Sequence, residues 1–118
     1  MPNVSGGVLV ARMLKAEGIE YIFSLVGGHI YPIYDACVEE GIKVIDVRHE
    51  AAAAHMAEGI ALVTGKPGVC LVTAGPGFTN VITGIANAQA AQYYAYQDAA
   101  LFLNSIPVQC RTWNRSRS

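Results

Sequence analysis

Short apolar runs alternate with amphipathic stretches over the first 91 residues, and this alternation predicts the secondary structure. The apolar, β-prone runs predict buried strands over residues 21–25, 43–47 and 69–72. Apolar residues at helical spacing predict helices over residues 5–17, 30–40, 51–64 and 78 to about 91. Ser5 is placed to cap the first helix, while Gly18 and Gly41 are placed to end the first two.

The predicted order of strand, short loop and helix repeats three times, at intervals of about 25 residues. Such a repeat is typical of βαβ units, whose strands form a parallel sheet with helices on both faces. We therefore predict an α/β fold. The loops that follow the three strands all lie at the carboxyl edge of the sheet, where open α/β sheets bind ligands.

The pattern changes after residue 91. Residues 92–98 show neither helical nor strand periodicity, residues 100–103 fit a helical turn or a fourth strand, and the final ten residues are polar. We predict a domain core over residues 1–91, an irregular or inserted segment over 92–108 that could complete it, and a disordered tail over 109–118. The domain would then be incomplete at its C-terminus.

The composition is that of a folded protein without a nucleic-acid-binding surface. The chain has 118 residues, which is enough for one domain, with 53% apolar and 14% charged residues. This balance excludes a disordered chain and favours burial of some apolar surface against another chain or domain. The formal net charge is −1, and the basic residues Arg111, Arg115 and Arg117 are too few to indicate nucleic-acid binding.

The sequence shows neither a membrane span nor a secretion signal. No apolar run approaches the ~18–20 residues of a membrane span, and no basic stretch precedes a hydrophobic one at the N-terminus. Cys37, Cys70 and Cys110 match neither a disulfide framework nor a zinc site. We therefore predict reduced thiols, no membrane partner and a cytoplasmic location.

Glu50 is the first candidate for chemistry. It follows a predicted buried strand and opens an alanine-rich helix, so its carboxylate is placed at the sheet edge among apolar residues. Burial there would favour the neutral carboxyl and suit proton chemistry, whereas the helix N-terminus would favour the anion. The alternative is that Glu50 only caps the helix.

The loop Gly75-Pro76-Gly77-Phe78-Thr79-Asn80 resembles part of a dinucleotide-binding fingerprint. Asn80 stands where the third glycine is needed, and no acidic residue ends a following strand, so a Rossmann NAD site is disfavoured. The loop either lets the backbone approach a flat ligand, with Thr79 or Asn80 adding polar groups, or needs its glycines for turn geometry alone.

The three histidines do not define a metal site. His55 and Glu58 lie one helical turn apart, but no second pair completes a set of ligands. His29 belongs to a Gly-Gly-His loop at the sheet edge. It is either a residue that faces a ligand or a surface histidine, and we predict no metal held by this chain.

Four motifs occur in order along the chain. They are Arg48-His49-Glu50 after a strand, the alanine-rich helix, Gly65-Lys66-Pro67-Gly68-Val69-Cys70, and Thr73-Ala74-Gly75-Pro76-Gly77-Phe78-Thr79-Asn80. Together they resemble the pyrimidine-binding (PYR) domain of thiamine-diphosphate enzymes, in the branch of acetolactate synthase, benzaldehyde lyase and related 2-oxoacid decarboxylases and 2-hydroxyacyl lyases. The resemblance covers roughly residues 4–91 and implies a flavodoxin-like arrangement of the sheet.

The resemblance implies a catalytic role for Glu50. In that family such a glutamate hydrogen-bonds nitrogen N1′ of the cofactor's aminopyrimidine and favours the imino tautomer, whose nitrogen takes the C2 proton of the thiazolium ring. By the same resemblance, Thr73, Pro76 and Asn80 bind the cofactor around the pyrimidine or lie at the interface with a neighbouring subunit.

The loop after the first strand differs among the branches of the family. Gly27-Gly28 and residues 31–36 resemble acetolactate synthases, whereas His29 resembles a histidine that faces the substrate in benzaldehyde lyase. His29 is therefore a second candidate catalytic residue, and the choice of branch stays open.

The resemblance also implies a partner. In these enzymes the cofactor lies between the PYR domain of one subunit and the pyrophosphate-binding (PP) domain of another, and the PP domain holds Mg²⁺ and the diphosphate. No Gly-Asp-Gly motif of a PP domain is present here. We therefore expect the isolated chain to be inactive and to need a PP domain or partner subunit in a homo- or hetero-oligomer. The late position of Ser105-Ile106-Pro107-Val108, with polar residues after it, indicates a truncated or alternatively joined chain.

Two other functions are consistent with parts of the sequence. A non-catalytic PYR-like fragment could act as a binding module through the alanines of helix 51–64, which form a small surface unless they pack within the chain's own fold, or it could be unstable. A Rossmann-type nucleotide binder would rest on the glycine loop alone.

Overall fold

A computed structural model describes residues 4–91 and 101–103 of the chain. Helices and strands alternate along these residues in the order α1 (Gly6–Ala16), β1 (Tyr21–Leu25), α2 (Tyr31–Glu39), β2 (Lys43–Asp46), α3 (Glu50–Thr64), β3 (Val69–Val72), α4 (Pro76–Ala91) and β4 (Leu101–Leu103). The predicted tail over 109–118, and all of the predicted segment over 92–108 except β4, lie outside the described residues.

The described strands form one parallel sheet in the order β2-β1-β3-β4. The predicted α/β fold is therefore confirmed, and the sheet has four strands where the apolar runs gave three. Leu101 pairs with Val69, so residues 101–103 form a strand rather than a helical turn. Strand β2 lies on one side of β1 and β3 on the other, which is the flavodoxin-like order. After β2 the chain crosses back over β1 to form β3 on its other side. The helices that follow β1 and β3 therefore lie on opposite faces of the sheet, and this switch point opens a crevice at the carboxyl ends of these strands.

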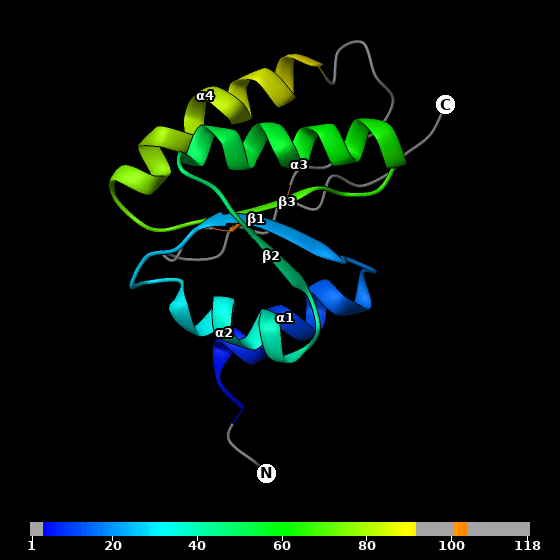
Figure 1. Cartoon of the computed structure of the whole chain (residues 1–118), viewed down its shortest axis with the longest axis vertical. Helices are drawn as coiled ribbons and strands as arrows, with labels where there is room; N and C mark the ends of the chain where they lie inside the picture. The colour runs from blue at the N-terminus through cyan, green and yellow to red at the C-terminus, as the bar shows by residue number, and fades with distance from the viewer. Residues whose placement is uncertain (1–3, 92–100, 104–118) are drawn as a thin grey trace.

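The two faces of the sheet are covered by different helix pairs. Figure 1 shows α1 and α2 on one face and α3 and α4 on the other. Successive side chains of a strand point to opposite faces, so Ile22 and Leu71 pack toward α1 and α2, whereas Phe23 and Cys70 pack toward α3 and α4. Both cores are apolar, which is the reason that β3 and most of β1 are buried apolar runs. Strand β2 was predicted to be buried over residues 43–47, but it is an edge strand that ends at Asp46, with Lys43 and Asp46 exposed.

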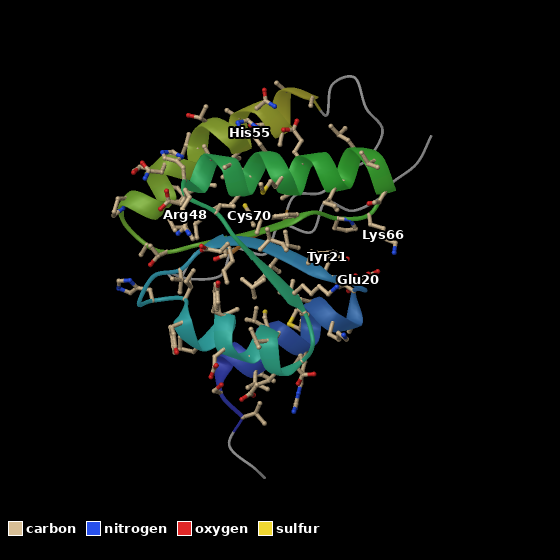
Figure 2. The ribbon with its side chains drawn as sticks, viewed as in Figure 1. Glu20, Tyr21, Arg48, His55, Lys66 and Cys70 are labelled. Atoms are coloured by element: carbon tan, nitrogen blue, oxygen red, sulfur yellow. The ribbon has the colours of Figure 1, made fainter. Side chains whose placement is uncertain are left out.

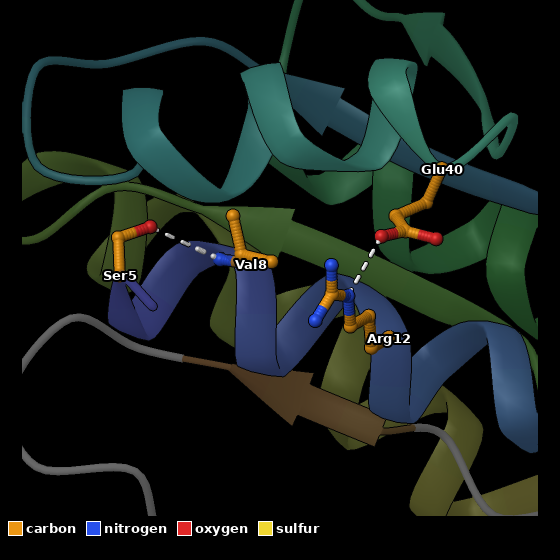
Figure 3. A network of polar contacts seen from close by, with 4 residues as sticks. All are labelled: Ser5, Val8, Arg12 and Glu40. Atoms are coloured by element: carbon orange, nitrogen blue, oxygen red, sulfur yellow. Dashed lines mark hydrogen bonds and ion pairs between the residues drawn. The ribbon is translucent and has the colours of Figure 1, made fainter. Parts of the chain in front are cut away.

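Polar contacts fix α1 at its start and against the end of α2 (Figure 3). The Ser5 hydroxyl accepts a hydrogen bond from the Val8 amide at 3.4 Å and caps the helix. Further along α1, Arg12 Nε lies 2.9 Å from Glu40 Oε1. This ion pair is exposed and contributes well under about 1 kcal/mol to stability.

The alanines of α3 pack within the chain. Ala53, Ala54, Ala57 and Ala61 are buried. Helix α4 lies directly on them, because a Cβ atom added to Gly84 would collide with the Ala54 Cβ and lie 3.0 Å from the Ala51 carbonyl oxygen. The small surface that the sequence offered for a binding module is therefore used for close packing of α3 against the sheet and α4.

Cys37 and Cys70 are free thiols in the two cores. Burial raises the pKa of each thiol to about 11, because the thiolate cannot be solvated there. Thiols of this kind are unreactive structural residues. Within the described part of the chain, no helix is long and apolar enough to cross a membrane.

Candidate functional site

The loops that follow β1 and β3 meet at the carboxyl edge of the sheet. A Cβ atom added to Gly27 would lie 2.7 Å from the Thr73 Cγ2, so only glycine allows the β1–α2 loop to approach Thr73 this closely. His29 belongs to the same loop, and its Nδ1 lies 3.5 Å from the Thr73 hydroxyl oxygen. The structure therefore brings two residues of the predicted site, His29 and Thr73, to the switch point.

Glu50 enters this edge from the other side as the first residue of α3. It is buried, with 6% of its surface exposed. The helix cap is His49, whose Nδ1 accepts a hydrogen bond from the Ala51 amide at 3.2 Å. The alternative that Glu50 merely caps the helix is therefore wrong, and α3 begins one residue earlier than predicted. With the cap supplied by its neighbour, the Glu50 side chain is free to turn inward.

The carboxylate of Glu50 is held by one side chain across the helix pair. Asn80 Nδ2, from α4, donates a hydrogen bond to Glu50 Oε2 at 3.0 Å. The other oxygen, Oε1, has no hydrogen bond or ion pair with any residue that the structure describes. A buried carboxylate with a vacant acceptor oxygen is costly unless a partner supplies a proton or a donor.

Gly77 lies close to that oxygen. A Cβ atom at this position would lie 3.4 Å from Glu50 Oε1 and 2.9 Å from Thr73 Cγ2. Helix α4 begins at Pro76, not at Phe78 as predicted, because proline fits the first turn of a helix. Pro76 is exposed at that start, and its carbonyl accepts a hydrogen bond from the Thr79 hydroxyl at 3.1 Å.

A second pairing of glutamate and asparagine joins α3 to α4 about two turns further along. Asn87 Nδ2 donates to both oxygens of Glu58 at 3.1 and 2.9 Å, and His55 Nδ1 lies 3.5 Å from Glu58 Oε2. This second pair was not predicted from the sequence. The available signal is that the two glutamates of α3, and the two asparagines of α4 that bind them, are each about two helical turns apart. Nowhere in the described ranges do three or more His, Cys, Asp or Glu side chains gather in a way that could hold a metal ion.

A hollow at the opposite end of the molecule is a poorer candidate. Figure 2 shows Glu20, Tyr21 and Lys66 together near the start of β1, far from Arg48, which follows β2. They line a cavity of about 150 Å³ with apolar neighbours, and the Lys66 ammonium lies 3.7 Å from Glu20 Oε1. No buried unpaired polar group of the described residues points there, in contrast to Glu50 at the carboxyl edge.

The carboxyl edge therefore defines a ligand-binding domain of the open α/β class. Its distinctive elements are Gly27 and Gly77, which both pack closely against Thr73, and the buried Glu50 oxygen beside Gly77. Oε1 can accept a hydrogen bond from a donor on a ligand, or share its proton.

Comparison with known proteins identifies the family. Residues 4–93 match the family described as thiamine pyrophosphate enzyme, N-terminal TPP binding domain. The chain belongs to this family of enzyme domains, which confirms the resemblance noted from the sequence. The match favours a cofactor-binding domain over the non-catalytic fragment and the nucleotide binder.

Individual relatives come from two kinds of enzyme. The chain is 56% identical over 90 residues to the acetolactate synthase large subunit of Mycobacterium tuberculosis, an alignment that covers 76% of this chain and 16% of the relative. It is 52% identical over 87 residues to 2-hydroxyacyl-CoA lyase 2 of Homo sapiens, covering 74% of this chain and 14% of the relative. The same lyase of Bos taurus is 53% identical over 87 residues, with 74% and 14% covered. The chain thus spans about one sixth of the length of these relatives.

Proposed function

We propose that this chain binds the aminopyrimidine of thiamine diphosphate through Glu50, as the PYR part of an enzyme that acts on 2-oxo acids or 2-hydroxyacyl substrates. The observation that carries the proposal is the buried Glu50 carboxylate, whose Oε1 lacks a partner among the described residues and lies beside Gly77 at the carboxyl edge. The names of the relatives, acetolactate synthase and 2-hydroxyacyl-CoA lyase, support the substrate class.

Bound thiamine diphosphate supplies a nucleophilic carbon for reaction at carbonyl groups. The role of this chain is to control one proton. Glu50 Oε1 accepts a hydrogen bond from the protonated ring nitrogen, or shares that proton, in a site where burial strengthens the interaction. Gly27 and Gly77 let their loops pack closely against Thr73. Thr73 and Pro76 line the pyrimidine side, Asn80 lies on that side beside Glu50, and His29 faces the substrate.

The diphosphate and Mg²⁺ are held in this proposal by a PP domain, on a longer polypeptide or on a partner subunit of a homo- or hetero-oligomer. Catalysis requires that domain, so the 118 residues alone are inactive. The free, buried thiols of Cys37 and Cys70 support a cytoplasmic location, because such thiols persist in a reducing compartment.

Thermal unfolding with and without thiamine diphosphate and Mg²⁺ tests the proposal. A ligand at 100 times its dissociation constant stabilises a protein by about 2.7 kcal/mol, which for a domain of this size raises Tm by about 10 °C or more. We expect this shift in the wild type and in Glu58→Gln, which alters the other α3 carboxylate, and a loss of most of it in Glu50→Gln. Equal shifts in both variants, or no shift in the folded wild type, would contradict the proposal.

A further inference from the structure

The hydrogen bond between Asn80 and Glu50 has a direction that matters for proton chemistry. The amide nitrogen of Asn80 is only a donor, so Glu50 Oε2, at 3.0 Å, must act as the acceptor. Oε2 is therefore engaged as an acceptor, and Oε1 is the carboxylate oxygen that remains available to a ligand.

Among the described residues around Glu50, only Asn80 distinguishes between the two carboxylate oxygens. Glu50 forms no ion pair within the described ranges, and its other electrostatic support is the N-terminus of α3. That support acts on both carboxylate oxygens and does not select between them. Gly77 lies beside Oε1 and has no side chain that could donate to it. The orientation of the carboxyl group is thus fixed by one side chain from α4.

We infer that Asn80 is a positioning residue, which holds Glu50 so that Oε1, and not Oε2, is presented to the ring nitrogen of the ligand. This inference rests on the proposed function and gives Asn80 a role that differs from direct contact with the cofactor. Its amide acts on the ligand through Glu50. Loss of the amide leaves a buried carboxylate without its one hydrogen-bond donor and free to rotate.

A pair of ligands separates this role from a general structural one. The first ligand is thiamine diphosphate, and the second is its analogue in which CH replaces N1′ of the pyrimidine. Dissociation constants for both, with Mg²⁺, are measured by calorimetry on the 118-residue wild type, Asn80→Ala and Asn87→Ala. Asn87→Ala is the matched control, because it removes the equivalent hydrogen bonds to Glu58 from the same helix pair.

We expect Asn80→Ala to weaken binding of thiamine diphosphate about tenfold, as for loss of a hydrogen bond to a charged group, and to leave binding of the analogue unchanged. Asn87→Ala should affect neither ligand. In a Glu50→Ala background, where there is no carboxylate to orient, Asn80→Ala should have no further effect. Thermal unfolding verifies that each variant is folded. Asn80 is exposed, so its replacement by alanine should leave the fold intact.

The outcomes distinguish the two proposals. If the wild type prefers thiamine diphosphate to the analogue, but Asn80→Ala weakens both equally or neither, the positioning role is overturned and the proposed function stands. If Asn80→Ala still weakens binding in the Glu50→Ala background, Asn80 contacts the ligand directly and the positioning role is again overturned. If the wild type binds neither ligand, or does not discriminate between them, the proposed function fails and this inference fails with it.

Discussion

Gly84 controls how closely α4 approaches α3, and its replacement by alanine should be destabilising although it occurs inside a helix. In a helix interior, alanine is favoured over glycine by about 1 kcal/mol. At this position, however, the new Cβ would collide with the Ala54 Cβ and lie 3.0 Å from the Ala51 carbonyl oxygen. Ordinary carbon contacts need about 3.5–4.0 Å. The atoms in the way belong to backbone or to a short side chain, so the helices must move apart.

Overpacking of this kind costs about 1–3 kcal/mol. We take the upper half of this range because neither neighbour can rotate away, and we subtract the propensity gain. Gly84→Ala should then lower the free energy of unfolding by about 1–2 kcal/mol, which corresponds to a decrease in Tm of about 5–10 °C. Separation of the helices would also stretch the bond between Asn80 and Glu50, so binding of thiamine diphosphate should weaken.

The matched control is Gly59→Ala, in α3, where an added Cβ would meet no atom within 4 Å. This variant keeps the propensity gain without the clash, so it should be stabilised by up to about 1 kcal/mol. Urea unfolding followed by circular dichroism measures both variants against the wild type. If Gly84→Ala is as stable as Gly59→Ala, the close packing of α3 and α4 described above is incorrect.

Three further predictions concern other parts of the chain. Gly77→Ala places a Cβ 2.9 Å from Thr73 Cγ2 and 3.4 Å from Glu50 Oε1, so it should displace these side chains and weaken binding of thiamine diphosphate at least severalfold by calorimetry while the fold is kept. Unchanged affinity would show that the positions of these side chains do not control binding. Ser24→Ala should cost about 1 kcal/mol in urea unfolding, because the buried Ser24 hydroxyl donates to the Leu71 carbonyl at 2.8 Å, and no change in midpoint would argue against that bond. In a Cys110→Ser background, Cys37 and Cys70 should resist a thiol reagent at pH 8 until the chain unfolds. The pKa of each thiol is about 11 in the folded chain and 9.0 when exposed, so the unfolded chain releases these protons at lower pH. The free energy of unfolding should therefore fall as pH rises from about 9 to 11. Rapid labelling of the folded chain would contradict the burial of these thiols.

The strands could be predicted from the sequence for a simple physical reason, whereas their order was implied only by the family resemblance. Strands buried on both faces are continuous apolar runs, and β1 and β3 begin and end at the predicted residues. The start of α4 could not be placed as well, because Pro76 breaks the apolar period although it suits the first turn. The strand at residues 101–103 is too short for its apolar residues to distinguish it from a helical turn.

The candidate site was only partly accessible from the sequence. Glu50 could be singled out because it follows a predicted strand and opens an alanine-rich, apolar helix. The cap by His49 was missed, since serine, threonine, aspartate and asparagine are the usual caps. The bond between Asn80 and Glu50 depends on how closely two helices pack, which Gly84 and Ala54 determine in three dimensions. No local sequence pattern predicts how closely α3 and α4 pack.

The most direct test of the central claim is an NMR titration of the isotopically labelled chain with thiamine diphosphate and Mg²⁺. We expect the largest amide shifts at the carboxyl edge of the sheet, in Gly27, Thr73 and Gly77, and we expect Glu50→Gln to reduce them. If the largest shifts occur instead at Tyr21 and Lys66, at the opposite end of the molecule, or if a saturating titration leaves the carboxyl edge unchanged, thiamine diphosphate does not bind at Glu50.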